Sequence, residues 1–366
     1  MKKILLALPL LLWGACRSLQ PTTAPPPAQL AVIAYFHGKA GEVQAYRVDQ
    51  LTHIIYSFCH LKGDELAVDD AADSLTIREL VALKKKHPQL KVLLSLGGWG
   101  GCASCSPVFA RAEGRHAFAV SVRRLMQEYG ADGIDLDWEY PGIEGYPGHA
   151  FDPSDKRHFT ELVQALRREL GPGAVISFAA GGFQQFFDHS VEWEAVMPLL
   201  NFVNIMSYDL VGGFSTRTGH HTALYSTPEQ ARSTDFGVRY LDSLGVPRNK
   251  MVIGAAFYAR SWEQVPDVNH GLYQPGKFKD FISYKHFADK LQAPQLGFVF
   301  YRDPVSQAPY AYSQRLGQFA TFDDALSIAA KTKYVREKGL AGIMFWQLTG
   351  DLPAGGLLQA IADAAR

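Results

Sequence analysis

The sequence predicts an α/β fold, a (β/α)8 TIM barrel with a small α+β subdomain inserted after its seventh strand. Two observations predict the barrel: eight short apolar runs rich in β-forming residues, and helical patterns that separate most of them. A third observation predicts the insertion. The connection from about residue 260 to 322 holds apolar and aromatic pieces of its own, and structureless loops of that length are uncommon.

The expected elements follow one another in the order that a barrel requires. We expect strands at 30–36, 51–58, 91–96, 133–139, 174–180, 202–208, 251–257 and 341–346. We expect helices at 74–87, 108–129, 155–170, 190–200, 228–244, 322–338 and 355–365. The barrel domain then covers 30–366, and the inserted subdomain covers 261–321.

The composition excludes two classes of protein. The chain has 366 residues with 36 basic and 36 acidic side chains, so its formal net charge is zero. Without an excess of positive charge to neutralise phosphates, we expect no nucleic-acid partner. Hydrophobic residues make up 47% of the chain, which with zero net charge argues against disorder.

The N-terminus has the pattern of a targeting segment. Lys2 and Lys3 precede an apolar run at 4–13 that is too short to span a bilayer, so we expect a signal peptide at 1–15. Small residues before Cys16 resemble a bacterial lipoprotein signal, with ordinary secretion as the alternative. The proline-rich stretch at 16–29 reads as a tether. We expect an outer-membrane lipoprotein, periplasmic or secreted protein that touches a membrane only through this anchor.

The remaining cysteines fit an oxidising compartment. Cys102 and Cys105 form a CxxC pattern, which is compatible with a loop disulfide, half of a metal site or a redox pair. We favour the disulfide, because no second ligand pair lies at metal spacing. We expect Cys59 to be a buried free thiol, and we expect no metal or other cofactor.

Residues 132–139 read Asp-Gly-Ile-Asp-Leu-Asp-Trp-Glu and carry the strongest signal in the chain. Side chains alternate along a strand, so Asp135, Asp137 and Glu139 share the face that points into a barrel. Like charges and burial both raise carboxyl pKa values, so at least one of these acids should hold a proton near neutrality.

Glu139 ends this strand at the carboxyl face, where barrel active sites lie. A protonated carboxyl there can donate to a leaving oxygen, which suits glycoside cleavage. Asp137 lies about 6–7 Å deeper on the same face, which is awkward for a carboxylate that must attack the opposite side of a sugar. We expect Asp137 to contact a group on the substrate instead.

The motif resembles the catalytic signature of family-18 glycoside hydrolases, the chitinases, and the resemblance covers about 30–366. Further segments are similar to the family's strand motifs in the right order: Ser-Leu-Gly-Gly-Trp at 95–99, Met-Ser-Tyr-Asp at 206–209, Phe-Tyr-Ala-Arg-Ser-Trp at 257–262 and Met-Phe-Trp at 344–346. The resemblance implies hydrolysis of chitin or chitooligosaccharides, with retention of configuration, by a barrel enzyme without a cofactor.

The resemblance also implies a role for each acid. Glu139 would be the general acid and then the base, while the substrate's own acetamido oxygen attacks and forms an oxazolinium ion. Asp137 would orient the acetamido group and share a proton with Asp135, and Tyr208 would donate a hydrogen bond to the acetamido carbonyl. We expect Asp132 to be structural.

Other residues are candidates for substrate binding; packing is the alternative for the apolar and aromatic ones, and a structural salt bridge is the alternative for Arg260. Trp346 suits a stacking floor, Trp99 after the Gly98 turn suits a leaving-side subsite, and Met206 suits the pocket lining. Tyr35 and Phe58 end the first two expected strands and would form a pocket wall. The candidate contacts to sugar hydroxyls are Asp209, Tyr258 and Arg260. For His220 and His221 we expect a place on the surface.

Several functions compete. The first is a chitinase. The alternatives are an endo-β-N-acetylglucosaminidase acting on glycoprotein glycans, a hydrolase of peptidoglycan, and a catalytically silent chitin-binding lectin. A lectin on this fold typically lacks the acid, whereas Glu139 is present. We expect a monomer.

Overall fold

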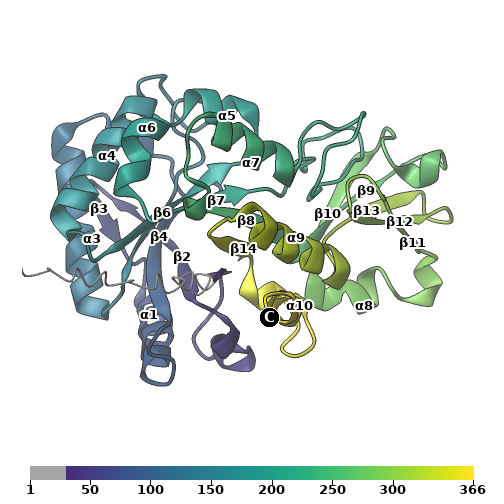
Figure 1. Cartoon of the computed structure of the whole chain (residues 1–366), viewed down its shortest axis with the longest axis horizontal. Coiled ribbons are helices and arrows are strands. Elements are labelled where there is room, and N and C mark those ends of the chain that lie inside the picture. The colour runs from purple at the N-terminus through teal and green to yellow at the C-terminus, as the bar shows by residue number, and fades with distance from the viewer. Residues whose placement is uncertain (1–29) are drawn as a thin grey trace, which may run out of the picture.

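The computed structural model describes residues 30–366 (Figure 1). The expected signal peptide at 1–15, the tether at 16–29 and the lipidation at Cys16 lie outside the described residues and stay predictions. Within residues 30–366, no helix combines the length and the apolar character needed to cross a bilayer.

A closed barrel of eight parallel strands forms the larger part of residues 30–366, which confirms the predicted (β/α)8 fold (Figure 1). Around the barrel the strands follow the order β1, β2, β4, β5, β6, β7, β8 and β14, and β14 pairs again with β1. Their bounds are β1 Ala31–Phe36, β2 His53–Lys62, β4 Lys91–Gly97, β5 Gly133–Asp137, β6 Val175–Gly181, β7 Phe202–Met206, β8 Met251–Ala256 and β14 Gly342–Trp346. The short strand β3 Glu65–Ala67 pairs antiparallel with the end of β2.

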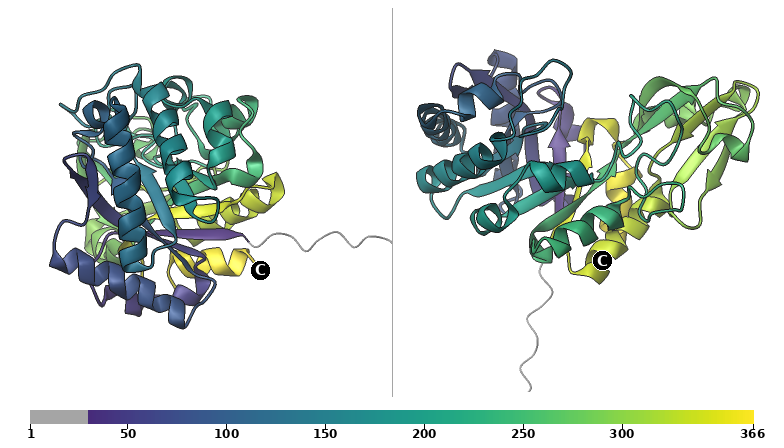
Figure 2. Two further views of the ribbon diagram at one scale, coloured as in Figure 1. Left: turned by 90° about the vertical axis from the view of Figure 1, so that its left-hand side faces the viewer. Right: turned by 90° about the horizontal axis from the view of Figure 1, so that it is seen from above.

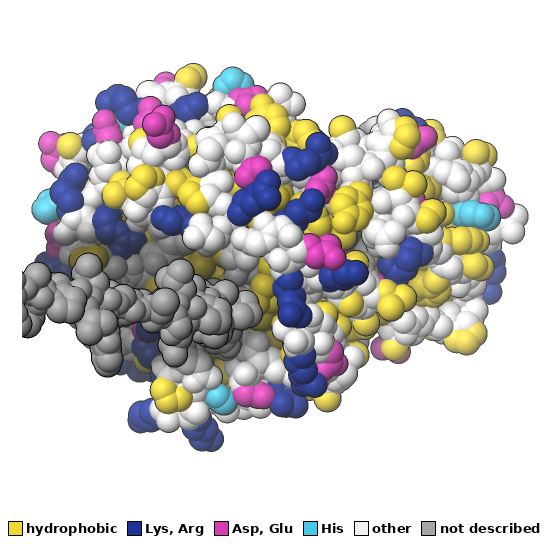
Figure 3. All heavy atoms as spheres, in the orientation of Figure 1, with side chains coloured by type: hydrophobic (Ala, Val, Ile, Leu, Met, Phe, Trp, Pro, Cys, Tyr) yellow, Lys and Arg dark blue, Asp and Glu magenta, His cyan; other side chains and the backbone are white. Residues whose placement is uncertain are grey.

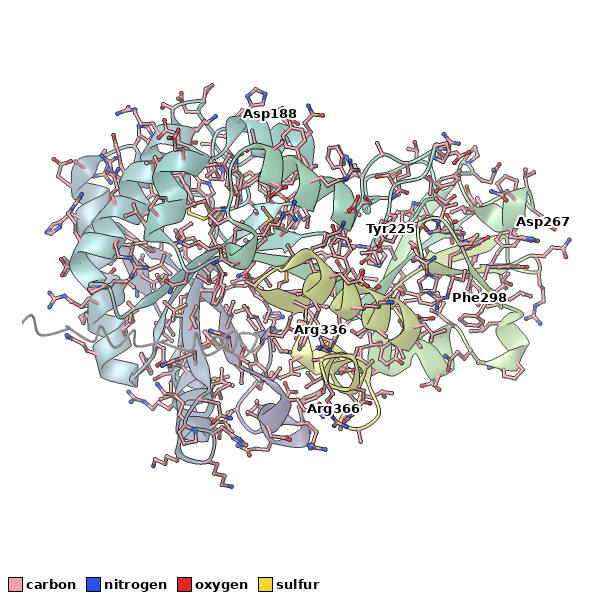
Figure 4. The ribbon with its side chains drawn as sticks, viewed as in Figure 1. Asp188, Tyr225, Asp267, Phe298, Arg336 and Arg366 are labelled. Carbon is pink, nitrogen blue, oxygen red and sulfur yellow. A yellow bond between two sulfur atoms is a disulfide. The ribbon has the colours of Figure 1, made fainter. Side chains whose placement is uncertain are left out.

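Helices surround the strands (Figure 2). Their bounds are α1 Ala71–Ala82, α2 Cys105–Phe109, α3 Ala112–Tyr129, α4 Asp155–Leu170, α5 Gln184–His189, α6 Trp193–Val196, α7 Thr234–Ser243, α8 Phe287–Lys290, α9 Ala325–Lys338 and α10 Leu357–Ala364. The helix expected at 190–200 is shorter, because α6 passes into a 3-10 turn that contains Pro198, which has no backbone N–H to continue it. Helix α9 packs on α10, and Arg336 donates to the carbonyl of Ala364 (3.4 Å) (Figure 4).

The second sheet follows β8 and stands beside the barrel (Figure 2). It is antiparallel, in the order β10, β9, β13, β12, β11, with bounds β9 Tyr258–Glu263, β10 Lys277–Ser283, β11 Val299–Arg302, β12 Pro309–Ser313 and β13 Gln318–Thr321. It begins at Tyr258 rather than at 261, because β9 starts only two residues after the end of β8. Separate apolar clusters cover its two faces, one around Phe287 and Phe322 and the other around Trp262 and Phe319.

Alternation along β5 sets the character of the barrel interior. Ile134, Leu136 and Trp138 pack outward against the helices, in the cluster that also holds Phe159 of α4. Asp135 and Asp137 point the other way and are buried. The inner apolar cluster is small, so the carboxyl end of the barrel is open to polar side chains.

A buried ion pair joins the barrel to the second sheet. Lys331 of α9 donates to Asp323 (2.7 Å), and both side chains are fully buried. Asp323 also accepts hydrogen bonds from the backbone N–H of Ala256 (3.0 Å) and from the hydroxyls of Thr222 (2.9 Å) and Ser327 (2.7 Å). One carboxylate therefore fixes the end of β8, the loop after β7 and the start of α9.

Replacing one partner of this pair should strongly destabilise the protein. We expect Lys331→Met to lower the free energy of unfolding by about 3–5 kcal/mol, because it leaves the Asp323 charge buried and unpaired. Urea unfolding measures the effect, and the double variant Asp323→Asn with Lys331→Met should recover part of it. The matched control is Lys333→Met on the exposed face of α9, expected to cost less than about 0.5 kcal/mol. Equal losses for the two single variants would contradict the structural importance of the pair.

Candidate active site

A large cavity of about 1420 Å³ opens at the carboxyl ends of the barrel strands. Barrel enzymes place their active sites at this face. Most of the predicted site residues line it, namely Phe58, Trp99, Asp137, Glu139, Met206, Tyr208, Asp209, Tyr258, Arg260 and Trp346. The cavity is therefore the candidate active site.

Asp135 lies at the bottom of the acidic row, below the cavity lining. It is fully buried and accepts hydrogen bonds from Ser177 (2.6 Å), Tyr35 (3.0 Å), Ser95 (3.1 Å) and Asn204 (3.1 Å). Burial raises the pKa of Asp135, and these hydrogen bonds oppose the rise by stabilising the charged form. Of the acids on this strand, Asp135 is thus the one best supplied with donors.

Asp137 lies one pleat higher, in the floor of the cavity. Burial, followed by the negative charges of Glu139 and Asp135, raises the pKa of Asp137 well above its ordinary value. Its Oδ1 has no hydrogen-bond partner among the described residues. Asp137, with one oxygen free of protein donors, is thus placed to meet a polar group of a ligand.

Glu139 follows the end of β5 and reaches the cavity. Burial raises the pKa of Glu139 to about 7, and the negative charge of Asp209 adds to the effect while a hydrogen bond from Tyr140 opposes it. The carboxyl therefore holds its proton through the mildly acidic range and releases it near neutrality, as a group that first donates and then accepts a proton must do.

The opposite wall of the cavity is aromatic. Strand β14 lies across the barrel from β5, so Trp346 at its end faces Glu139. The Trp346 ring lies nearly parallel to Phe58 (5.7 Å between centroids, 13°) and is stacked with His37 (5.9 Å, 24°). These contacts hold the indole as a half-buried flat surface on which the apolar face of a sugar can stack.

Strands β7 and β9 provide a polar wall. Burial raises the pKa of Tyr208 well above its ordinary value, so its hydroxyl remains a donor. Arg260 binds Asp209 through two hydrogen bonds of 2.7 Å, and this pair holds the pKa of Asp209 below its usual range against the effect of burial. The guanidinium also lies within 5.6 Å of the ring centroids of Tyr258, Phe278 and Phe281.

Some predicted residues lie elsewhere. Tyr35 does not form a pocket wall, because its ring is fully buried and its hydroxyl is bonded to Asp135. Gly98 does not line the cavity either. A Cβ at Gly98 would lie 2.4 Å from the Phe58 ring, so this glycine leaves room for that ring. Asp132 lies outside the cavity, where it binds Lys84 (2.7 Å) and the N–H of Val92 (2.9 Å).

The prediction that His220 and His221 lie on the surface is wrong. Both are fully buried, because the loop after β7 packs between the barrel and the second sheet. His220 contacts Asp303 (3.0 Å), and His221 lies 3.5 Å from Asp209.

Cys102 and Cys105 form a disulfide, and Cys59 is a buried free thiol. Among residues 30–366, no group of three or more His, Cys, Asp or Glu is arranged to hold a metal ion. The expectation of a cofactor-free site stays a prediction.

Sequence reasoning missed several cavity residues. Tyr146, Phe183, Phe214, Phe278 and Phe281 line the cavity from loops and from the second sheet. Tyr146 and Phe214 follow glycines in loops directly after the β5 and β7 motifs. An aromatic residue in such a position is the signal that could have identified them.

Comparisons with known proteins agree with this geometry. Residues 31–351 match the family described as Glycosyl hydrolases family 18. Chitinase A1 of Niallia circulans is 31% identical over 329 residues, covering 79% of this chain and 46% of that protein. This chain therefore spans about half the length of that relative.

Solved structures are similar over most of the chain. A family-18 N-acetylglucosaminidase from Paenibacillus barengoltzii is 35% identical with a TM-score of 0.80, covering 92% of this chain and 100% of that one. Chitinase ChiA74 from Bacillus thuringiensis is 27% identical with a TM-score of 0.84, covering 92% of this chain and 70% of that one.

The Glu139 carboxyl should titrate near pH 7, and Asp209→Asn should lower its pKa. The substitution removes a nearby negative charge and leaves the Arg260 cation unpaired, and both changes favour the ionised form of Glu139. Carboxyl ¹³C NMR of glutamate-labelled protein measures the midpoint, with Glu139→Gln to assign the signal. Asp363→Asn, an exposed carboxylate change on α10, is the control and should leave the midpoint unchanged. A midpoint near 4.5 in the unsubstituted protein, or a higher one in Asp209→Asn, would contradict this electrostatic account.

Proposed function

We propose that this chain, which belongs to the glycosyl hydrolases of family 18, hydrolyses β-1,4 bonds between N-acetylglucosamine units of chitin or chitooligosaccharides. One observation carries the proposal. A carboxyl whose pKa is raised to about 7, Glu139, faces an aromatic wall, while the more deeply buried Asp137 in the same cavity keeps an oxygen without a hydrogen-bond partner. The cavity therefore offers one proton donor and a surface for a sugar.

The arrangement of the carboxyl groups favours one mechanism over the other. Retaining glycosidases of the usual kind place a nucleophilic carboxylate about 5–5.5 Å from the acid, on the opposite face of the sugar. Here the wall across from Glu139 is Trp346, and Asp135 and Asp137 lie deeper on the strand that Glu139 follows. The remaining acid beside Glu139, Asp209, has both carboxylate oxygens bound by Arg260. We therefore assign the nucleophile to the substrate, whose own acetamido oxygen can attack the anomeric carbon.

Each residue of the site has its own role in this reaction. Glu139 donates its proton to the glycosidic oxygen as the bond to the anomeric carbon breaks, and the acetamido oxygen forms the new bond to that carbon. Asp137 accepts a hydrogen bond from the acetamido N–H and offsets the positive charge of the oxazolinium ion. The Tyr208 hydroxyl donates a hydrogen bond to the acetamido oxygen. The ionised Glu139 then removes a proton from water, which attacks the anomeric carbon and restores the acetamide.

The aromatic wall and the polar wall of the cavity orient the sugar. Trp346 would stack on its apolar face, and Met206 would pack beside it. Arg260 keeps N–H groups free for sugar hydroxyls, because its two bonds to Asp209 use one side of the guanidinium. Tyr258 lies next to this pair in the cavity wall.

A second candidate is an N-acetylglucosaminidase acting on short chitooligosaccharides. It is favoured by the similarity over the full length of the structure from Paenibacillus barengoltzii that is described as a family-18 N-acetylglucosaminidase. Mass spectrometry of products from chitohexaose, a glycoprotein glycan and peptidoglycan separates this activity, the endo-acting alternatives and a chitinase. A lectin is disfavoured, since the cavity keeps the Glu139 carboxyl, which can act as a proton donor.

We also propose that the protein works outside the cytoplasm as a monomer, anchored by a lipid on Cys16 or secreted. The signal-like N-terminus supports this location. The Cys102–Cys105 disulfide supports it as well, because such bonds persist in oxidising compartments.

Glu139→Gln should abolish turnover while leaving binding intact. Glutamine keeps the shape of the protonated acid but cannot give up a proton, so we expect kcat on chitohexaose to fall by about 10²–10⁴-fold with Kd little changed. Glu128→Gln, an exposed change on α3, is the control and should retain full activity. Turnover by Glu139→Gln at the rate of this control would rule out the assignment of the acid.

A further inference from the structure

A buried histidine that has no part in the reaction above lies behind the polar wall of the cavity. His221 comes from the loop after β7, and its side chain is fully buried. Its Nδ1 lies 3.5 Å from Oδ1 of Asp209, and its ring is tilted against Tyr258 (5.1 Å between centroids, 50°). Asp209 and Tyr258 line the cavity, whereas His221 does not. The histidine therefore supports this wall from behind.

The backbone of His221 joins the wall to the second sheet. Its carbonyl accepts a hydrogen bond from the N–H of Leu210 (3.0 Å), the residue directly after Asp209. Its own N–H donates to the hydroxyl of Thr321 (3.2 Å) in β13. The turn that carries Asp209 is thus held to the second sheet through His221.

Asp209 depends on such support, because its backbone lies in the left-handed region, with φ 52°. Aspartate tolerates this conformation better than most residues, but it still costs free energy that other contacts must offset. Arg260 binds both oxygens of the carboxylate at 2.7 Å, and His221 contacts one of them. These two residues together therefore set the position of the negative charge that acts on Glu139.

The groups around His221 leave its imidazole neutral. Acidic and basic side chains are mixed on the surface drawn in Figure 3, where water and salt screen them. In the interior, burial is the largest effect and lowers the pKa of His221. Asp209 and Asp323 oppose this effect, and Arg260 adds to it. The buried Lys331 is paired with Asp323 and offsets its charge.

A neutral imidazole carries one N–H, on Nδ1 or on Nε2. Neither nitrogen of His221 has a hydrogen-bond partner of ordinary geometry among residues 30–366. A buried N–H without a partner is costly, and a carboxylate is a strong acceptor. A small rotation of the ring would bring Nδ1 from 3.5 Å into hydrogen-bond range of Asp209. The tautomer with its proton on Nδ1 is therefore the favoured one.

We propose that His221 is a positioning residue for the acid: its Nδ1–H donates to Asp209 and thereby limits how strongly the Asp209 charge acts on Glu139. The inference rests on the proposed function and deepens it. Because His221 does not line the cavity, it acts only through Asp209. The carboxylate shares its charge with two donors, so its negative field at the acid is weaker than that of a carboxylate held by Arg260 alone.

The first test removes the donor. In His221→Leu the Asp209 charge is less well compensated, so the Glu139 carboxyl should titrate about 0.5–1 pH unit higher, opposite to the effect of Asp209→Asn. His221→Asn can place an amide N–H near the position of Nδ1 and should restore the midpoint to within about 0.2 unit. Carboxyl ¹³C NMR of glutamate-labelled protein measures the midpoint. The alkaline fall of kcat/KM on chitohexaose should move by the same amount.

The neighbouring histidine provides the matched control. His220 is also fully buried in this loop, but it contacts Asp303 (3.0 Å) rather than Asp209. His220→Asn should lower the free energy of unfolding in urea and leave the Glu139 midpoint unchanged. The control therefore separates a loss of loop packing from a loss of the contact with Asp209.

The second test uses the unsubstituted protein, so it stands even if His221→Leu does not fold. ¹⁵N NMR of histidine-labelled protein reports the tautomer of each ring, and His221→Asn assigns the signal. We expect the ring of His221 to be neutral at neutral pH with its proton on Nδ1.

Three results would overturn the inference. They are a proton on Nε2 with a bare Nδ1, a Glu139 midpoint that His221→Leu leaves unchanged, and equal shifts in His221→Leu and His220→Asn. A proton on Nδ1 with a shift confined to His221→Leu supports it. The NMR measurements need no turnover. If the unsubstituted protein does not cleave chitohexaose, the proposed function fails separately from the contact between His221 and Asp209.

Discussion

The active site depends on how the barrel accommodates three carboxyl groups on the inner side of one strand and its end. Asp135 can be buried because Tyr35, Ser95, Ser177 and Asn204, from four other strands, donate to it. No comparable set of donors reaches Asp137, whose pKa is raised further. The pKa of Glu139, at the mouth of the barrel, is raised to about 7. Burial in the barrel thereby raises the pKa values of these carboxyl groups, which water would otherwise favour in their ionised form.

The second sheet completes the site by fixing its side wall. Strand β9 continues directly from β8, so Tyr258 and Arg260 come from the sheet yet face the barrel mouth. The buried carboxylate of Asp323 holds the end of β8 and the loop after β7 together. This loop also brings His221 to Asp209, the residue whose negative charge raises the pKa of Glu139. The loop after β7 therefore links the stability of the second sheet to the pKa of Glu139.

The sequence predicted those features that follow from the periodicity of side chains along single strands and helices. The alternation of acids at 132–139 placed Asp135 and Asp137 on the inner face, and eight apolar runs predicted the barrel. Contacts between segments far apart in the sequence could not be predicted from such patterns. Tyr35 lies near the end of its strand, a position that suggested a place in the cavity wall. Its hydroxyl instead points into the barrel, where it donates a hydrogen bond to Asp135. The burial of His221 depends on the packing of a loop against the second sheet.

The central claim is that the substrate supplies its own nucleophile. It is tested most directly with 4-methylumbelliferyl chitobiosides whose reacting sugar carries an acetyl, fluoroacetyl, difluoroacetyl or trifluoroacetyl group on nitrogen. Fluorine withdraws electrons from the amide oxygen, so participation predicts a steep fall in kcat/KM with each added fluorine. A kcat/KM that stays constant along the series would mean that the amide does not attack, and would contradict the mechanism assigned to Glu139 and Asp137.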